Sequence, residues 1–538
     1  MNIKENIKRI IEESLNDLNF SSTKLLIERP KNIKFGNYTT NIALLLAKEL
    51  KINPFLIAQK IKEGIKKNNL IEKIDVIKPG FINIYLSKDS LLEILPLIIK
   101  EKDNFGRSNL GKNKKINIEF ASVNPTGLLH LGHARGSAYG DNISRLLSFV
   151  GFNVTKEYYI NDGGNQIDNL GISIKERYKE LCGMKFKIPE DGYFGAEIKN
   201  IAEKIYINNN NKYIDKPLDY FKDIGVSELI NKIRIDLENF RIKFDVWTSE
   251  KEIRKGGKIE ETLNKLKILN KTYEKENALW LKSSIYGDEK DRVLIKKDGE
   301  YTYLTPDIAY HLDKFDRGFQ NLINVFGADH HGYVPRLKAG VEALGYNKEQ
   351  LEVKIVQMVR LLKGREEIKM SKRTGNVVTL EDLLEEVGVD SVRYFFAMRN
   401  IDTQMDFDID LALKKSNENP FYYVGYAHAR ICSILKEIKK DIYCNKFTTI
   451  KDEYAYNMIA KLHEFSDVIK ISALKNAPHL ITNYLYDLAN LFHIYYTNEK
   501  IIVEDEKMLK ERIMLITAVK IVIKNGLNLI GVEAPQKM

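Results

Sequence analysis

With 538 residues, the chain is too long for one hydrophobic core, so roughly two to four domains are expected. Its composition, 44% apolar and 29% charged, is typical of a soluble globular protein. No apolar run reaches the roughly 18 residues of a membrane span. The three cysteines are widely spaced and favour neither a disulfide framework nor a structural zinc site. The net charge of +10 indicates either an anionic partner such as nucleic acid or simply a lysine-rich coding composition, and charge alone does not decide between them.

Residues 1–110 are predicted to form a small α+β domain. The first segment, MNIKENIKRIIEESL, has apolar side chains at helical spacing and lacks the continuous apolar core of a signal peptide, so a cytoplasmic location is expected. A second helix is expected to start at Asn37 or Thr39, and INPFLIAQKIKEGIKK predicts a third. IDVIKPGFINIYLS predicts two strands that turn at Pro79-Gly80.

From Lys115 the pattern changes to a strand, a glycine-containing turn, a helix and a second strand. The segments INIEFAS, NPTGLLHLGHARG, SAYGDNISRLLSFVGF and NVTKEYYI form a βαβ unit, which predicts an α/β domain with a Rossmann-like, doubly wound parallel sheet over residues 111–410. Residues from about 165 to 290 are long, charged helical patterns and are interpreted as a helical insertion into that domain. Residues 411–538 are predicted to form an all-α bundle, so the chain is expected to be an α/β multidomain protein.

Two histidines, His130 and His133, follow the first strand of this unit, with Gly132 between them. At the carboxyl end of a parallel strand the N–H groups of the next helix point toward the ligand. Imidazoles three positions apart share one face of a helix, so both could donate to phosphate oxygens while Gly132 admits the nucleotide. A coincidental pair is the alternative, because HxGH arises by chance in roughly one chain in a hundred of this length.

A second basic motif, EEIKMSKRTGN, follows the strand-like segment VKIVQMVRLL. Its lysines, Lys369 and Lys372, are predicted to lie in a mobile loop that neutralises a triphosphate, since lysine binds phosphate as a flexible point charge. A solvated basic turn is the alternative in so lysine-rich a chain. The order of the two motifs on one βαβ frame favours the nucleotide site.

HLGH followed by KMSK resembles the two signature sequences of class I aminoacyl-tRNA synthetases. The segments EFASVNPTGLLHLGHARG, EYYINDGGNQI, YLTPDIAYHLDKF, GADHHGYVPR and NPFYYVGYAHARI are similar to arginyl-tRNA synthetases, in the same order. FGNYTTNIALLLAKEL and GVEAPQKM extend the resemblance over essentially the whole chain. It implies a ligase that activates L-arginine with ATP and Mg²⁺ to arginyl-adenylate and transfers arginine to the 3′ end of tRNA(Arg), releasing AMP and pyrophosphate.

An arginine site needs carboxylates that pair with the planar guanidinium. Asp307 follows YLTP, where Thr305 is expected to cap a helix and Pro306 to occupy its first position. Glu119 lies in the strand before the histidines. The helix dipole alone could favour Asp307 at that position, and a different strand register would place Glu119 in solvent. The resemblance implies that arginine is bound by Glu119, Asn124, His130, Tyr303, Asp307 and His331.

The resemblance also implies the residues around ATP. His130, His133, Lys369 and Lys372 would act on the phosphates, and Gly132, Gly327, Asp329 and Met358 would complete the ATP site. The first signature region is expected to comprise Ser122, Val123, Asn124, Pro125, Thr126, Gly127, Leu128, Leu129, His130, Leu131, Gly132 and His133.

The flanking domains are expected to bind tRNA, with residues 1–110 near its outer corner and residues 411–538 on the anticodon side. Aromatic side chains stack on unpaired bases, although tyrosines in a bundle are more often part of its core. The candidate residues are Tyr422, Tyr423, Tyr426, Arg430 and Met538. A monomer is expected by analogy. Two other functions stay open at this point: a class I synthetase for another amino acid, and a tRNA-binding relative without catalysis.

Overall fold

The computed structural model describes residues 3–20, 25–30, 35–364, 366–368, 378–438, 443–444 and 446–538. Contacts divide the chain into two compact units. Unit 1 comprises Met1–Phe105, Ile431–Phe465 and Asn490–Val522. Unit 2 comprises Gly106–Arg430, Ser466–Ala489 and Ile523–Met538.

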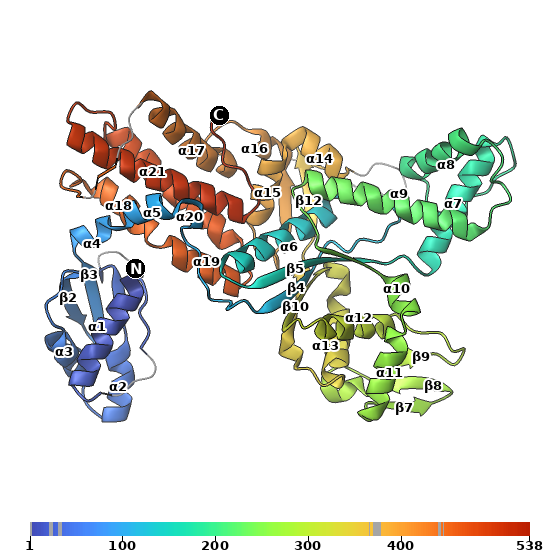
Figure 1. The fold of residues 1–538 in the computed structure, drawn as a ribbon, viewed down its shortest axis with the longest axis horizontal. Helices are drawn as coiled ribbons and strands as arrows, with labels where there is room; N and C mark the ends of the chain where they lie inside the picture. The colour runs from blue at the N-terminus through green and yellow to red at the C-terminus, as the bar shows by residue number, and fades with distance from the viewer. Residues whose placement is uncertain are drawn as a thin grey trace. The chain divides into compact units, whose positions relative to one another are not determined.

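Five parallel strands form the central sheet of unit 2 in the order β11-β10-β4-β5-β6 (Figure 1). The strands are β4 (Lys115–Glu119), β5 (Asn153–Ile160), β6 (Val246–Ser249), β10 (Asn321–Gly327) and β11 (Leu351–Val356). The chain adds β5 and β6 on one side of β4 and then β10 and β11 on the other, so the strand order reverses between β4 and β10. Doubly wound sheets bind ligands beyond the carboxyl ends of their strands at such a reversal. The prediction of a Rossmann-like doubly wound sheet is therefore confirmed.

Helix α6 (Leu131–Phe149) follows β4 and is buried along most of its length. Gly140 allows it to pack closely, because a Cβ atom there would lie 2.2 Å from the ring of Phe120. Asp141, inside the helix, is fully buried and ion-paired with Arg393 and Arg145, at 2.6 Å each. Burial alone would raise the pKa of Asp141, but these two guanidiniums together with Lys156 lower it. The helix that carries the two histidines is thus fixed by charge pairing as well as by packing.

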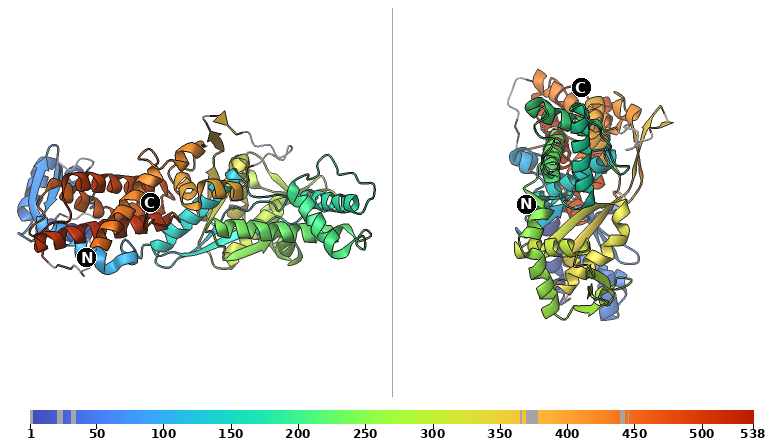
Figure 2. Two further views of the ribbon diagram at one scale, coloured as in Figure 1. Left: turned by 90° about the horizontal axis from the view of Figure 1, so that it is seen from above. Right: turned by 90° about the vertical axis from the view of Figure 1, so that its right-hand side faces the viewer.

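The segment predicted as a helical insertion contains both helices and strands. Its helices α7 (Asn165–Leu181), α8 (Ala196–Asn209) and α9 (Leu218–Asn239) pack around a common core (Figures 1 and 2). The segment also contains β6 of the central sheet and two strands of an antiparallel sheet formed by β7 (Thr272–Lys275), β8 (Ala278–Leu281) and β9 (Arg292–Ile295). These strands have four residues each, too few for their periodicity to stand out from the charged helices around them.

Unit 2 contains further elements between β6 and the C-terminal helices. They are α10 (Glu250–Lys255), α11 (Lys258–Ile268), η3 (Ser283–Tyr286), α12 (Leu304–Asp316), η4 (Ala328–Tyr333), α13 (Val334–Ala343), η5 (Lys348–Gln350), β12 (Val359–Lys363), β13 (Glu366–Glu367), α14 (Leu380–Val387), α15 (Val389–Ala397), β14 (Met405–Asp408) and α16 (Ile409–Leu413). β12 pairs with β13 in antiparallel and with β14 in parallel orientation. After residue 300, helices and strands alternate in the order α12, β10, α13 and β11.

The N-terminal elements of unit 1 form a small α+β fold, as predicted. They are α1 (Ile3–Asp17), β1 (Tyr38–Thr40), α2 (Ile42–Leu50), α3 (Pro54–Gly64), β2 (Ile71–Ile77), β3 (Phe81–Leu86), α4 (Lys88–Leu92), α5 (Ile94–Glu101) and η2 (Lys102–Asn104). The predicted turn between β2 and β3 is confirmed, but the predicted helix start at Asn37 or Thr39 is wrong. Thr39 lies in β1 opposite Asn83 of β3, and the helix begins only after Asn41. Pairing with a distant strand outweighs the local capping preference here.

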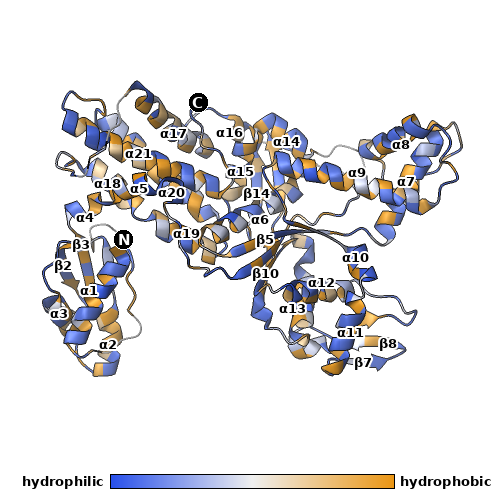
Figure 3. Ribbon diagram, viewed as in Figure 1, coloured by the Kyte–Doolittle hydropathy of each residue, from blue (hydrophilic) through white to orange (hydrophobic). Residues whose placement is uncertain are grey.

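All described elements after α16 are helices, as predicted. They are α17 (Pro420–Glu437), α18 (Glu453–Leu462), α19 (Phe465–Leu474), α20 (His479–Asn498) and α21 (Glu506–Leu529). Apolar and polar residues alternate along them (Figure 3). Across the part of the chain that the structure describes, no helix is both long and apolar enough to cross a membrane.

Candidate active site

Glu119, the last residue of β4, is buried at the carboxyl edge of the sheet. Its carboxylate accepts a hydrogen bond from Lys314 Nζ at 2.7 Å, and the two side chains are 6% and 0% exposed. Ser122 Oγ donates to the other oxygen at 3.1 Å. A buried carboxylate is stable only when paired. Glu119 therefore does not face solvent, and the register alternative is excluded.

Asp307 lies in the first turns of α12, close to Glu119. Burial, together with the negative charges of Glu119 and Glu250, raises the pKa of Asp307 to about 7, against the charge of Lys314 and a hydrogen bond donated by the Tyr333 hydroxyl. The expected capping is wrong: α12 begins at Leu304, and Thr305 donates its hydroxyl to the carbonyl of Leu294 at 2.7 Å. The Thr305 hydroxyl is therefore bonded to β9 and does not cap the N–H groups of α12.

His311 holds α12 against the sheet beside these carboxylates. Its Nδ1 lies 2.7 Å from the carbonyl oxygen of Asp307, and its Nε2 lies 3.0 Å from the amide nitrogen of Asn324. Asn324 is the β10 residue directly opposite Glu119. Burial lowers the pKa of His311 to about 3, so the ring is neutral and donates to Asp307 while it accepts from Asn324. This chain of contacts brings Asp307 and Glu119 to one place.

The carboxylates here outnumber the cations that pair with them. Lys314 pairs with Glu119, and Arg254 pairs with Glu250 at 2.6 Å. Asp307 has no ion-pair partner within 4.0 Å among the described residues. A cationic ligand would supply the missing partner, and a guanidinium would match a carboxylate with two parallel hydrogen bonds.

The two predicted histidines form the N-terminal turn of α6. His130 is the N-cap residue, its Nδ1 accepts the N–H of Gly132 at 3.2 Å, and its own N–H donates to His133 Nδ1 at 3.4 Å. The two rings stack with centroids 3.6 Å apart. Because each Nδ1 accepts a hydrogen bond, a neutral ring carries its proton on Nε2, and that N–H can donate to a phosphate oxygen. The prediction that both imidazoles share the first turn is confirmed.

The other residues predicted for small substrates lie at the ends of elements. Asn124 donates to the side-chain oxygen of Gln166 at 2.7 Å. Tyr303 precedes α12 and is 76% exposed, and Met358, between β11 and β12, is 68% exposed. Exposed positions in or next to η4 are occupied by Gly327, Asp329 and His331. Lys369 and Lys372 lie outside the described residues, as does the rest of KMSK.

Two site residues were missed from the sequence. Lys314 lies seven positions after Asp307 in α12, a spacing that returns to the same helix face. This spacing of an acidic and a basic residue in one helix could have been noticed. Tyr333 reaches Asp307 from η4, and no local pattern in the sequence indicates that contact.

Three of the candidate tRNA residues of α17, Tyr422, Tyr426 and Arg430, lie on a common face. The rings of Tyr422 and Tyr426 stack with centroids 5.9 Å apart, and the Arg430 guanidinium lies 6.0 Å from the Tyr426 ring. Tyr423 packs on Tyr486 instead. The side chain of Met538 is close to Gly425 of α17, where a Cβ atom would lie 2.8 Å from the sulfur.

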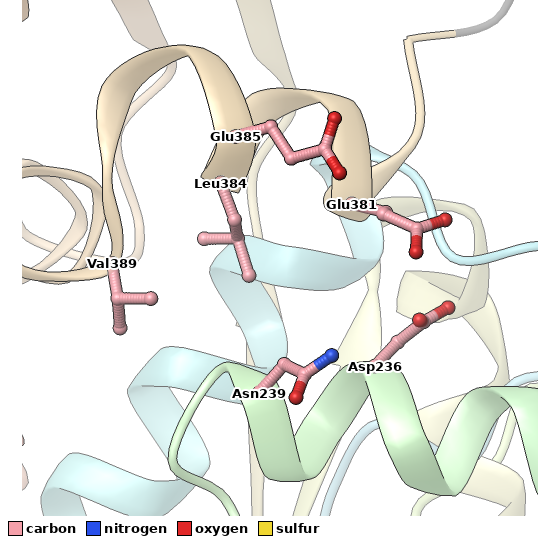
Figure 4. A pocket seen from close by; sticks show the side chains of 6 residues that line it. All are labelled: Asp236, Asn239, Glu381, Leu384, Glu385 and Val389. Atoms are coloured by element: carbon pink, nitrogen blue, oxygen red, sulfur yellow. The ribbon is translucent and has the colours of Figure 1, made fainter.

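A separate hollow of about 210 Å³ lies beside α9 and α14 (Figure 4). Its lining residues are Asp236, Asn239, Glu381, Leu384, Glu385 and Val389. Lys232 pairs with Asp236 at 2.9 Å and with Glu381 at 2.8 Å. None of the residues predicted for the active site lines it.

Comparisons with known proteins cover the whole chain. Residues 2–86 match the Arginyl tRNA synthetase N terminal domain, residues 94–409 the catalytic domain described as tRNA synthetases class I (R), and residues 424–538 the DALR anticodon binding domain. Arginine--tRNA ligase 1 of Halalkalibacterium halodurans is 48% identical over 96% of this chain and 94% of its own. Arginine--tRNA ligase of Bacillus subtilis is 46% identical over the full length of both chains.

A solved structure shows the same fold. Thermus thermophilus arginyl-tRNA synthetase superimposes with a TM-score of 0.80 at 21% identity, covering 99% of this chain and 100% of that one. Sequence and fold therefore agree over the full length, and the chain belongs to the arginyl-tRNA synthetase family, in class I.

Proposed function

We propose that the protein is an arginine–tRNA ligase whose amino-acid pocket is formed around Asp307 and Glu119. The observation that carries this proposal is the environment of Asp307. Its carboxyl group is buried near those of Glu119 and Glu250, and among the described residues it has no ion-pair partner, whereas each of the other two has one. A neutral amino-acid side chain would leave that charge unpaired, whereas the guanidinium of arginine pairs with it. This favours arginine over the substrates of other class I enzymes.

The reaction has two steps. The carboxylate of arginine attacks the α-phosphate of ATP, which forms arginyl-adenylate and releases pyrophosphate. The terminal ribose hydroxyl of tRNA(Arg) then attacks the acyl carbon, which forms arginyl-tRNA and releases AMP. Both steps depend on positioning and on neutralising phosphate charge more than on a covalent nucleophile. The α6 N-terminus and its two imidazoles supply donors of this kind.

We assign the residues to their substrates as the resemblance implies. The phosphates contact His130, His133, Gly132, Lys369 and Lys372, the ribose and adenine contact Gly327 and Asp329, and arginine contacts Glu119, Asn124, His130, Tyr303, Asp307 and His331. The resemblance implies Met358 in the ATP site, and we place it at the adenine. Among the described residues no group of three or more His, Cys, Asp or Glu side chains could hold a metal ion. As the resemblance implies, Mg²⁺ would enter with ATP and neutralise its phosphates.

The tRNA would contact the flanking segments. We propose that residues 1–110 bind its outer corner and that residues 411–538 bind the anticodon side, after a catalytic domain at 111–410. The column formed by Tyr422, Tyr426 and Arg430 offers stacking surfaces for unpaired bases. Tyr423 and Met538 stay candidates from the sequence. A monomer in the cytoplasm completes the proposal.

The test is ATP–pyrophosphate exchange with each of the twenty amino acids, with and without total tRNA from the source cell. We expect exchange with arginine only. Exchange with a different amino acid would overturn the assignment of the carboxylates. No exchange from folded protein that still binds tRNA would favour a non-catalytic relative. The arm without tRNA shows whether activation needs tRNA.

A further inference from the structure

Arg135 lies two residues after His133 on α6 and is fully buried. Its guanidinium donates to three backbone carbonyl oxygens: Gln357 at 2.9 Å, Thr403 at 2.8 Å and Asn400 at 2.9 Å. Burial lowers the pKa of Arg135 to about 10, which still leaves it charged at neutral pH. Among the described residues its hydrogen bonds go to neutral carbonyls, and the charge of Asp402 offsets only part of the effect of burial. A buried charge held in this way is costly to desolvate, so its retention needs an explanation.

The three carbonyls belong to two loops that are bonded to each other. The N–H of Gln357 donates to the carbonyl of Ile401 at 3.2 Å, and the N–H of Met405 donates to the carbonyl of Met358 at 3.1 Å. One loop joins β11 to β12, and the other leads into β14, the parallel neighbour of β12. Arg135 therefore attaches both loops to the helix whose N-terminal turn carries the two histidines.

We propose that Arg135 is a positioning residue for ATP, which sets the base-binding loop at Met358 at a fixed distance from the phosphate-binding turn of α6. The inference rests on the proposed function, which places adenine at Met358 and the phosphates at His130 and His133. ATP spans both places, so its binding requires their separation to be correct. A planar guanidinium with five donors in a fixed fork can hold two loops at once, whereas an ammonium cannot reproduce that geometry.

Arg393 offers a matched control. It is equally buried, it lies on α15, and it also donates to backbone carbonyls, those of Phe240 at 2.8 Å and Ile530 at 3.1 Å. It also binds α6, through Asp141 and Asn142. Its partners do not include the loop at Met358, so its substitution tests what general destabilisation does to ATP binding.

The test uses the full chain with Arg135→Lys, Arg135→Gln and Arg393→Lys. Equilibrium dialysis measures the binding of ATP and of arginine, and thermal melting measures the fold. We expect Arg135→Gln to weaken ATP binding by about tenfold or more and arginine binding by less than about twofold, with Arg135→Lys between it and the wild type. Arg393→Lys should lower the melting temperature without this selective loss.

Hydrogen exchange in the unliganded protein gives a second readout that tolerates a weakly folded variant. The amides of Gln357 and Met405 should exchange faster in Arg135→Lys than in Arg393→Lys. Unchanged exchange there, or ATP and arginine binding weakened equally in both arginine variants, would overturn the inference and leave Arg135 as a structural residue only. Wild-type protein that fails to bind ATP would overturn it too. Wild-type protein that binds ATP but lacks arginine-dependent exchange in the presence of tRNA would overturn the proposed function alone.

Discussion

The two sides of the proposed active site, the amino-acid side at Glu119 and Asp307 and the phosphate side at the start of α6, hold charge in different ways. At the amino-acid side, the groups are the buried carboxyl side chains of Glu119 and Asp307. They come close only because β4, α12 and η4 pack together, with Lys314 and Tyr333 as partners. At the phosphate side, the donors belong to the first turn of α6 and to the two imidazoles next to it. The N–H groups and the dipole of a helix attract an anion without any buried charged side chain. A cation site therefore depends on tertiary structure, whereas the anion site is encoded within a few consecutive residues.

Removing Lys314, the cation that pairs with Glu119, should have the largest effect of the changes proposed here. Lys314→Met leaves Glu119 buried without its partner, which should lower the free energy of unfolding by roughly 3–5 kcal/mol. Urea unfolding of the unliganded protein measures it. Lys414→Met is the control, since Lys414 and Glu418 form an exposed pair that solvent screens, so its loss should change stability little. Equal losses in the two variants would mean that the buried pair has no special role.

Asp307→Asn should remove the carboxylate that faces the substrate while keeping the side-chain shape. Arginine would then place its guanidinium against an amide, at a cost of roughly 2–5 kcal/mol in kcat/KM for arginine, with a much smaller effect on KM for ATP. Steady-state aminoacylation measures both. Asp313→Asn is the control on the same helix, where Asp313 pairs with Arg317 at the surface. An unchanged arginine dependence in Asp307→Asn would remove this residue from the pocket.

The pH dependence of arginine binding should report on the same carboxylate. Below its pKa of about 7, Asp307 must lose a proton before it pairs with a guanidinium, so affinity should fall about tenfold per pH unit below 7 and level off above it. Calorimetry between pH 5.5 and 8.5 measures the affinity, and Asp307→Asn should flatten the profile. A wild-type profile without a break would contradict the raised pKa.

The stability of the unliganded protein should change with pH in the opposite direction to its affinity for arginine. Because the pKa of Asp307 is raised on folding, its contribution to stability is fully present below the unfolded value of about 3.9 and is lost as pH rises through about 7. The same group therefore makes the empty protein less stable at the pH at which it binds arginine best. Asp307→Asn should remove that part of the pH dependence.

The contrast between an anion site formed by consecutive residues and a cation site formed by distant ones also explains which features the sequence could predict. The strand, turn and helix around His130 are consecutive, so their pattern indicated both the fold and the phosphate-binding turn. The partner of Glu119 lies 195 residues away in the chain, and only folding brings the two together. The error at Thr39 has the same origin, because its strand pairs with Asn83. Short strands such as β6 were missed since four residues show no clear period.

The smallest predicted effect concerns Tyr333, which donates its hydroxyl proton to Asp307. In Tyr333→Phe that donor is lost, so the pKa of Asp307 should rise further, and arginine affinity at pH 7 should fall by about 1 kcal/mol, or roughly fivefold. The break in the pH profile should move upward. Tyr346→Phe is the control, because that ring stacks on Phe315 in the same layer.

The position of the break decides what Tyr333 does. If affinity falls and the break moves to higher pH, the hydroxyl acts through the carboxylate, and affinity should recover at alkaline pH, where Asp307 is ionised in both proteins. If affinity falls equally at every pH, the hydroxyl contacts arginine directly and the tuning of Asp307 comes from burial and from its acidic neighbours alone. Unchanged affinity would mean that the pocket rearranges when arginine binds. The contact between Tyr333 and Asp307 in the unliganded protein would then not determine how tightly arginine binds.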